Sequence, residues 1–402
     1  MKKIELLAPA GDLEKCKTAI LYGADAVYLG GKKFSLRSRA SNFDIEDIKE
    51  ACDFARSHNA NIHVTVNIIP HESDFEGIKE YLKTLEEIGV TAIIVASPAI
   101  AQIARKVASK LEIHLSTQLS ITNYKSVEYF DDIKPDRVVL ARECTMDEIR
   151  YITKNINTNT ETFIHGGMCV NYSGRCTISN ALTLRDANRG GCAQSCRWKY
   201  HLYDGENKIS DDEILFSMSS KDLMAIDKVY DMIEANVSSL KIEGRMKSNY
   251  YIATVVKTYR KLIDEIYENK KRPDKDRIEY YEREIAKAEN RLTSSGFYDG
   301  LPNESGHLYG INGAGVTHDF IGVILDQDDD YAYVQTRNLY RLNDELEVFG
   351  PDIDNETFVV TTIIDENDEN VELVNRPMSV MKINIPFKVS KGDMIRRFHD
   401  DN

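Results

Sequence analysis

The stretch IELLAPAGDLEKCKTAILYGADAVYLGG (residues 4–31) decides the fold. Two short apolar runs, residues 4–8 and 26–30, flank an amphipathic segment at residues 13–22. Asp12 immediately precedes that segment and is a residue type that commonly caps helices. A strand, a helix and a second strand in this order predict two parallel strands joined by a crossover helix.

The same alternation continues through roughly the first 250 residues, the usual length of a closed barrel of eight strands and eight helices. Strand-length runs rich in Ile, Val and Leu alternate with amphipathic segments, as in parallel strands that are buried on both faces. Asp44, Ser73 and Thr145 are placed to start three of the helices. The eight predicted strands are residues 4–8, 26–30, 61–67, 92–96, 112–116, 137–141, 162–165 and 239–243.

The predicted fold is therefore an α/β protein with a closed (β/α)8, TIM-like barrel. An open doubly wound sheet is the alternative, but no glycine-rich dinucleotide fingerprint follows the first strand. A closed barrel places its active site at the carboxyl ends of the strands. The polar residues predicted at those ends are Asn67, Ser116, Thr117, Gln118, Arg142, Glu143, His165, Lys241, Glu243 and Arg245.

Four residues at the strand ends are candidate catalytic groups. His165, Glu143 and Glu243 are residue types that commonly transfer protons, and Arg245 can orient or stabilise an anion. A structural ring of ion pairs is an equally good interpretation of Glu143, Glu243 and the neighbouring arginines. A packing role is the corresponding alternative for His165.

A cysteine-rich loop follows the seventh predicted strand. The segment ETFIHGGMCVNYSGRCTISNALTLRDANRGGCAQSCRWKY (residues 161–200) holds four of the seven cysteines, Cys169, Cys176, Cys192 and Cys196. Its five basic and two acidic residues give a local charge of +3 in a chain of net charge −14. Nearby cations favour the thiolate form, which is the form that binds metals.

Three interpretations of these four cysteines stay open at this stage. They could form disulfides or be unrelated thiols, although the chain has the appearance of a cytosolic protein. Structural zinc sites usually pair cysteines two to four residues apart, which fits only Cys192 and Cys196. Iron–sulfur clusters held by four cysteines accept more varied spacings.

Length and composition indicate a globular protein with an ample core. The 402 residues are 42% hydrophobic and 29% charged. The amino terminus lacks a secretory pattern and no run approaches the roughly 18 apolar residues of a membrane span. We therefore expect a cytoplasmic protein. The pI near 5.2 argues against indiscriminate nucleic-acid binding but permits a local basic face.

The chain divides into three predicted parts. Residues 1–270 form the barrel with its four-cysteine, metal-binding insertion at 168–200, residues 271–314 form a helical connector, and residues 315–402 form a small C-terminal β domain. Further helices are expected at 219–235, 249–268 and 277–291, with a hairpin around Asp204 and Gly205. Short runs broken by turn residues predict a β-barrel or sandwich at the end of the chain. Its expected strands are residues 319–325, 331–336, 344–349, 357–364, 371–375, 383–387 and 393–398.

Several motifs resemble a known family along nearly the whole chain. Besides the opening stretch they are HLSTQLSITN (114–123), RVVLARE (137–143), FIHGGMCVNYSGRC (163–176), NRGGCAQSCRWKY (188–200), FSMSSKDL (216–223), SLKIEGRMKS (239–248), DFIGVILD (319–326), TRNLYRLNDELEVFGP (336–351) and GDMIRRF (392–398). In this order they are similar to the collagenase-like peptidase family U32, and most of all to its tRNA-hydroxylating branch. The segment NRLTSSGFYDG (290–300) departs from the glycine-rich arginine motif of many relatives.

The resemblance implies RNA modification. Members of that branch form 5-hydroxyuridine at the wobble position of tRNA in an oxygen-independent, prephenate-dependent reaction, and several members of the family carry a [4Fe–4S] cluster. On this sequence the implied ligands are Cys169, Cys176, Cys192 and Cys196, and in air the site is expected to be empty, oxidised or zinc-filled. The implied partners are a tRNA anticodon loop and a paralogous subunit, with no membrane.

Cations, one aromatic residue and one amide near the predicted barrel mouth are candidates for substrate binding, because unpaired bases stack on aromatic rings and phosphates attract cations. They are Gln118, Arg142, Tyr172, Arg175, Arg189, Arg197 and Lys241. Two other functions remain open: peptidase activity, and a non-catalytic role in a paired hydroxylase. The sequence contains neither a G-x-S-x-G elbow nor an H-E-x-x-H zinc helix.

Overall fold

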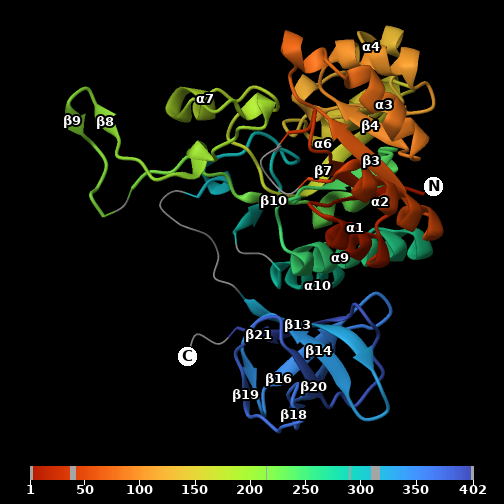
Figure 1. Cartoon of the computed structure of the whole chain (residues 1–402). Coiled ribbons are helices and arrows are strands. Elements are labelled where there is room, and N and C mark those ends of the chain that lie inside the picture. The colour runs from red at the N-terminus through yellow and green to blue at the C-terminus, as the bar shows by residue number, and fades with distance from the viewer. Residues whose placement is uncertain (1–2, 37–41, 214, 289–290, 309–316, 400–402) are drawn as a thin grey trace.

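The computed structural model describes residues 3–36, 42–213, 215–288, 291–308 and 317–399. Eight parallel strands form a closed barrel, because the last barrel strand pairs with both the first and the seventh (Figure 1). The strands are β1 (Glu5–Pro9), β2 (Ala26–Gly30), β3 (Asn61–Val66), β4 (Ala92–Val95), β5 (Glu112–Leu115), β6 (Arg137–Val139), β7 (Asn159–Gly166) and β11 (Ser239–Ile242). The predicted barrel and its eight strands are confirmed.

Helices cover the outside of the barrel. They are α1 (Leu13–Leu21), α2 (Ile45–Ser57), α3 (Ile78–Glu87), α4 (Pro98–Val107), α5 (Tyr124–Glu128), α6 (Met146–Asn155), α8 (Val229–Glu234) and α9 (Asn249–Asn269), followed by α10 (Lys275–Ala286). Asp12, Asp44 and Thr145 each accept a hydrogen bond from a backbone N–H of the first turn, so these predicted helix starts are confirmed. The start at Ser73 is wrong, because Ser73 lies in a short 3-10 turn and α3 begins after Gly77.

The segment before α8 differs from the prediction. Residues 219–235 were expected to form one helix, but β10 (Asp222–Met224) comes first and pairs antiparallel with β7. The edge of β7 that is left free beyond the end of β6 takes Leu223 and Met224 into its ladder, which outweighs their helical pattern. The hairpin around Gly205 is present as β8 (Tyr203–Asp204) and β9 (Asn207–Lys208), and Tyr200 pairs with Phe216 at its base.

Within the barrel lies a layer of buried charge. Lys241 Nζ is 2.7 Å from Glu161 Oε1, and Arg137 Nη1 is 3.0 Å from Glu161 Oε2. Arg137 also pairs with Glu5 on β1. The four residues belong to β11, β7, β6 and β1, so the ion pairs join strands on both sides of the closing β7–β11 seam. From the sequence, Lys241 was predicted as a substrate-binding residue, whereas Glu5, Arg137 and Glu161 were read only as parts of strands.

The C-terminal domain is a second β structure with its own apolar core. Its main sheet is antiparallel, in the order β17-β16-β21-β13-β14-β20-β18. Its strands are β13 (His318–Gln327), β14 (Ala332–Thr336), β16 (Glu345–Phe349), β17 (Glu356–Val359), β18 (Ile363–Ile364), β20 (Val380–Ile383) and β21 (Met394–Phe398), with a separate pair of β15 (Tyr340–Arg341) and β19 (Leu373–Val374). The strand expected at 383–387 lies earlier, and the one at 357–364 is split in two. The predicted boundary at residue 314 lies outside the described residues.

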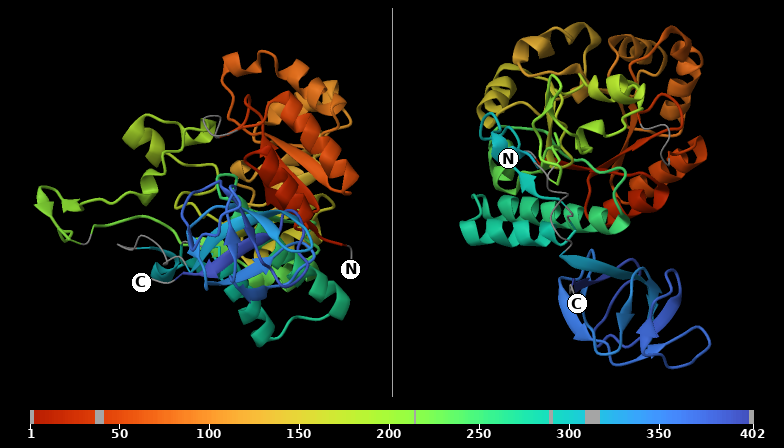
Figure 2. Two further views of the ribbon diagram at one scale, coloured as in Figure 1. Left: turned by 60° about the horizontal axis from the view of Figure 1, so that its bottom comes forward. Right: turned by 90° about the vertical axis from the view of Figure 1, so that its left-hand side faces the viewer.

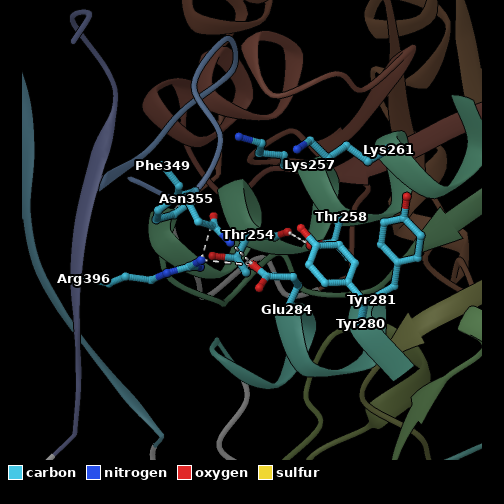
Figure 3. A pocket seen from close by; sticks show the side chains of 10 residues that line it. All are labelled: Thr254, Lys257, Thr258, Lys261, Tyr280, Tyr281, Glu284, Phe349, Asn355 and Arg396. Carbon is cyan, nitrogen blue, oxygen red and sulfur yellow. Dashed lines mark hydrogen bonds and ion pairs between the residues drawn. The ribbon is translucent and has the colours of Figure 1, made fainter. Parts of the chain in front are cut away.

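A buried arginine and buried hydrogen bonds connect the β domain to α10 and α9, which lie between it and the barrel (Figures 1 and 2). Arg396 is only 1% exposed and its Nη2 is 3.1 Å from Glu284 Oε2 on α10. Lys257 on α9 donates to the carbonyls of Gly350 and Ile353, and burial lowers the pKa of Lys257 to about 8. Figure 3 shows these side chains around a cavity of about 20 Å³, which has room for a water molecule and no larger ligand.

No helix among the described residues is long and apolar enough to cross a membrane.

We predict that Glu161→Gln destabilises the barrel by about 3–5 kcal/mol, because the change removes one partner of a fully buried ion-pair network. Urea unfolding would measure the loss. Glu87→Gln on the exposed face of α3 is the matched control and should change the free energy of unfolding by less than about 0.5 kcal/mol. Equal effects of the two substitutions would contradict this assignment.

The same carboxylate has a predictable pH dependence. Burial would raise the pKa of Glu161, but Lys241 and Arg137 outweigh burial and hold the pKa at about 2, below its usual value of 4.5. The folded state therefore binds fewer protons than the unfolded state in this range, and stability rises with pH. The contribution of Glu161 should be complete above pH 4.5 and be lost as the pH falls towards 2.

Candidate functional site at the barrel mouth

The cysteine loop is fixed onto the turns that follow β5 and β6. The backbone N–H of Ser173 donates to Glu143 Oε1 at 2.9 Å, and Ser120 Oγ donates to the carbonyl of Ser173 at 2.6 Å. Gly174 has a φ of +74°, and a Cβ there would lie 2.0 Å from the carbonyl oxygen of Gln118. Only glycine fits this close approach. Glu143, predicted as catalytic, here holds the loop in place.

Five of the predicted site residues line one cavity of about 160 Å³ at the barrel mouth; they are Gln118, Arg142, Lys241, Glu243 and Arg245. We call it the mouth cavity. Three of its described lining residues are cations, and Glu243 is the one carboxylate. Gln118 Oε1 accepts hydrogen bonds from Asn67 Nδ2 at 2.8 Å and Ser116 Oγ at 3.1 Å. This arrangement favours an anionic ligand over a cationic one.

Packing orients the cations of the mouth cavity. The guanidinium of Arg142 lies 3.9 Å from the centroid of the Phe163 ring, and its Nη2 is 3.8 Å from Glu243 Oε2. Lys241 Nζ lies 4.4 Å from the centroid of the Tyr28 ring while it pairs with Glu161 beneath. Such contacts with aromatic rings hold a cation in place without neutralising its charge.

Arg245 and Glu243 complete the mouth cavity. Arg245 Nη2 donates to the carbonyl of Leu36 at 2.7 Å. The hydroxyl of Tyr28 donates to Glu243 Oε2 at 3.2 Å. Gly166, at the end of β7, has a φ of +101°, and a Cβ there would lie 2.3 Å from the carbonyl oxygen of Glu243. Glycine at this point lets the start of the cysteine loop pass directly over the end of β11.

A larger cavity of about 460 Å³ adjoins the mouth cavity, and we call it the cysteine cavity. Cys169, Cys192 and Cys196 line it, and Arg142 and Glu243 line both cavities. The fourth cysteine, Cys176, accepts a hydrogen bond from Asn171 Nδ2 at 3.3 Å. Besides Arg142, the cations on the wall of the cysteine cavity are Arg185, Arg197 and Lys247.

The thiols of the loop influence one another electrostatically. Burial raises the pKa of Cys169, the neighbouring Cys176 and Cys192 raise it further, and Arg142 lowers it. Burial and Cys169 raise the pKa of Cys196, and Arg197 opposes them. Cys169 and Cys192 are nevertheless exposed on the cavity side. Within the part of the chain that the structure describes, no three His, Cys, Asp or Glu side chains are gathered closely enough to hold a single metal ion.

His165 lies away from these cavities, on the α9 side of β7. Its ring is 5.8 Å from the ring of Tyr251 and 5.6 Å from that of Tyr259, and the Tyr259 hydroxyl is 3.4 Å from Nδ1. Burial lowers the pKa of His165 to about 3, with a smaller contribution from Lys247. The imidazole is therefore neutral at physiological pH, and its surroundings are those of a packed residue.

The remaining predicted contacts lie on the loop surface. Arg189 Nη1 is 2.6 Å from Asp74 Oδ2 and donates to the carbonyl of Ile69 at 2.8 Å, so its charge is largely compensated. Arg175 is exposed, and its Nε donates to Ser120 Oγ at 3.2 Å. Tyr172 is also exposed. Arg197 Nη2 lies 3.9 Å from Asp222 Oδ1 at the wall of the cysteine cavity.

Asp222 is a site residue that sequence reasoning missed. It is buried at the wall of the cysteine cavity, with its carboxylate 3.1 Å from Arg291 Nε and 3.8 Å from Lys247 Nζ. Its position in the FSMSSKDL motif was the available signal, but the motif was read as the start of a helix. In the structure this aspartate lies between several cations of the cavity wall.

Family models match both domains. The model described as peptidase family U32 matches residues 11–307, and the model of the U32 C-terminal domain matches residues 316–396. The chain belongs to peptidase family U32. The resemblance inferred from the motifs is thereby confirmed.

Three relatives indicate how varied the family's functions are. The chain is 45% identical to tRNA hydroxylation protein P1 of Bacillus subtilis, over 98% of this chain and 95% of that protein. It is 40% identical to the 23S rRNA 5-hydroxycytidine C2501 synthase of Escherichia coli, over 67% of this chain and 40% of that protein. It is 31% identical to the collagenase of Porphyromonas gingivalis, over 98% and 97% of the two chains.

We predict that Gly174→Ala releases the cysteine loop from the barrel, because its Cβ would overlap the Gln118 carbonyl. Gly205→Ala is the matched control: its φ is +61° and a Cβ there meets nothing within 4 Å. Both substitutions carry the cost of a positive φ, about 1 kcal/mol. Limited proteolysis between residues 167 and 200 should accelerate only in Gly174→Ala, and equal cleavage of both variants would contradict the proposed clamp.

Proposed function

We propose that this protein hydroxylates RNA, and specifically that it converts the wobble uridine of tRNA to 5-hydroxyuridine. The observation that carries the proposal is the identity of 45% along nearly the whole chain to a protein named for tRNA hydroxylation. A second relative, named for hydroxycytidine synthesis, also adds a hydroxyl group to a pyrimidine of RNA. The cavities at the barrel mouth offer sites for the parts of such a reaction. A cytoplasmic location follows from the tRNA substrate.

We propose that Cys169, Cys176, Cys192 and Cys196 hold a [4Fe–4S] cluster. Such a cluster takes one cysteine thiolate for each iron, so its ligands surround an object larger than an ion and need not converge on one point. Three of the four thiols surround a cavity that has arginines on its wall. This arrangement suits a cluster better than a single zinc ion, whose ligands would have to converge on one point. When bound, the cluster would supply electron transfer or activation of a small oxygen donor.

We propose that prephenate, which carries two carboxylates, is the co-substrate and binds in the mouth cavity. Lys241 is paired with Glu161 beneath the cavity. Arg142 and Arg245, against the single carboxylate of Glu243, leave the described lining with an excess of positive charge. Guanidinium groups bind carboxylates through paired N–H donors. Because Arg142 lines both cavities, an anion bound to it would lie beside the cysteines.

Replacement of the C5–H of uridine by C5–OH balances with an oxygen donor XO as R–H + XO → R–OH + X, in which the donor accepts the two electrons and the C5 proton ends on the new hydroxyl group. Glu243 is the carboxylate that lines both cavities, and Tyr28 and Arg142 fix its position. We therefore assign proton transfer at the bound anion to Glu243 and anion orientation to Arg245. The placement of Glu143 and His165 favours structural roles for these two residues.

Peptidase activity is the second candidate, because a relative of nearly equal length is named a collagenase. A thiol protease would require a thiol and an imidazole within hydrogen-bond reach. His165, four residues before Cys169, instead packs against tyrosines of α9. A non-catalytic role beside a paralogous subunit is a third candidate. In that case the chain alone would not restore the modified nucleoside to a host that lacks its own hydroxylases.

We predict that the chain restores 5-hydroxyuridine to the tRNA of a host that lacks its own wobble-uridine hydroxylases, and that Cys176→Ala abolishes this. The variant should also lose iron and sulfide when it is purified without oxygen, because the four thiolates act as one ligand set. Mass spectrometry of tRNA nucleosides is the readout. Cys52→Ala in α2, a buried cysteine away from the loop, should retain the modification. Full activity of Cys176→Ala would exclude the cluster.

We predict that the salt dependence of anticodon stem-loop binding identifies the RNA rim. Arg185 is exposed at the cysteine cavity, and Arg185→Ala should reduce the slope of log affinity against log salt by about 0.7 if one loop phosphate is neutralised. Arg189→Ala is the control, because Asp74 already compensates its charge. A change of slope in Arg189→Ala but not in Arg185→Ala would place the RNA elsewhere.

A further inference from the structure

The segment between α10 and the β domain is built into the wall of the site. Its β12 strand (Thr293–Ser294) pairs with β10, and the N–H of Asp222 donates to the carbonyl of Leu292 at 3.0 Å. Further along, the N–H of Lys221 donates to the carbonyl of Gly306 at 3.0 Å. The described part of the segment at residues 290–300, which departs from the family motif, therefore belongs to a stretch of chain that is hydrogen-bonded to β10 and to the residue before it.

Tyr298 anchors this segment to the barrel. Its side chain is buried, its hydroxyl donates to the carbonyl of Phe163 on β7, and its carbonyl accepts from the N–H of Met146 at 3.2 Å. Gly296 turns the chain with a φ of +61°, and a Cβ there would lie 3.1 Å from the Leu223 side chain. With Tyr298 directed into the protein, the adjacent Phe297 lines a cavity on the other side.

This cavity has a volume of about 270 Å³, and we call it the side cavity. Its apolar wall includes Met168, Phe297 and Leu301, and its polar wall includes Ser220, Lys221 and His307. Met168 and Cys169 line the cysteine cavity as well. The side cavity and the mouth cavity therefore adjoin the cysteine cavity through different residues.

We propose that the side cavity receives the target base of the RNA, swung out of its loop. The proposal rests on the proposed function and adds the place where the base binds. Enzymes that modify a base take it out of the stack into a pocket, where aromatic or apolar side chains contact its faces and polar groups contact its edge. The volume lies just below the roughly 300–1,000 Å³ of pockets for drug-sized ligands, which suits a single nucleoside.

The charges of the two outer cavities support this division. The mouth cavity is rich in cations and suits an anion, whereas the described lining of the side cavity contains no carboxylate and only Lys221 as a permanent cation. A pyrimidine is neutral, with carbonyl oxygens that can accept from Lys221 or Ser220. A base held against Phe297 and Met168 would lie beside Cys169, next to the cluster proposed there.

The test compares two RNA hairpins with the anticodon-loop sequence, one with the target uridine and one with an abasic ribose at that position. Full-length wild-type protein should bind the uridine hairpin at least about five-fold more tightly, the lower end of what stacking of one base contributes. Phe297→Ala should remove most of this preference, and Phe297→Tyr should restore it. Leu301 is 90% exposed, so Leu301→Ala should fold normally and reduce the preference to an intermediate value.

Phe54→Ala is the matched control, since Phe54 is also a partly buried phenylalanine but lies on α2; it should keep the full preference. An unchanged preference for the uridine hairpin in both Phe297→Ala and Leu301→Ala would overturn the base pocket. That result is also the one expected if the side cavity binds a peptide side chain instead of a base. Failure of wild-type protein to bind either hairpin would overturn the RNA function itself. The two failures are therefore distinguishable.

Discussion

The ion pair between Glu161 and Lys241 is the interaction on which the site depends. It joins β7 to β11 at the seam where the barrel closes, and Arg137 extends it to β6. A buried carboxylate would be costly without partners, and here it holds Lys241 beneath the mouth cavity with its charge directed at the ring of Tyr28. Closure of the barrel and positioning of one cation of the mouth cavity therefore have the same cause.

From this seam the site extends through shared residues. Arg142 and Glu243 connect the mouth cavity to the cysteine cavity, and Met168 and Cys169 connect the cysteine cavity to the side cavity. An anion, a cluster and a base could thus be bound next to one another without any of them occupying the same space. The close contact of Gly174 with Gln118 keeps the cysteine loop, and with it the cysteine cavity, over the barrel.

Sequence patterns predicted the barrel well because buried parallel strands give continuous apolar runs with clear ends. They also predicted that five side chains would lie together, because parallel strands end at the same face of the barrel. The structure places these five in one cavity: Gln118, Arg142, Lys241, Glu243 and Arg245. They failed where tertiary contacts decide. Leu223 and Met224 joined the edge of β7 instead of continuing a helix from Asp222, and His165 turned towards the tyrosines of α9.

Charge compensation was equally invisible to the sequence. Arg189 and Asp74 are far apart along the chain, so nothing local indicated that the arginine is paired. The wall formed by the segment around Phe297 was missed for a related reason, since its role depends on hydrogen bonds to the residues around β10. The metal ligands and the domain boundaries remain predictions.

The central claim is that this single chain oxidises a uridine of RNA at the cavities around its cysteines. The most direct test is a reconstitution with protein purified without oxygen, its iron and sulfide restored, together with unmodified tRNA and prephenate. The account predicts a nucleoside one oxygen atom heavier than uridine at the wobble position, formed in proportion to the protein and absent with Cys176→Ala. Unchanged tRNA with cluster-loaded protein, together with saturable cleavage of gelatin by the same preparation, would contradict it.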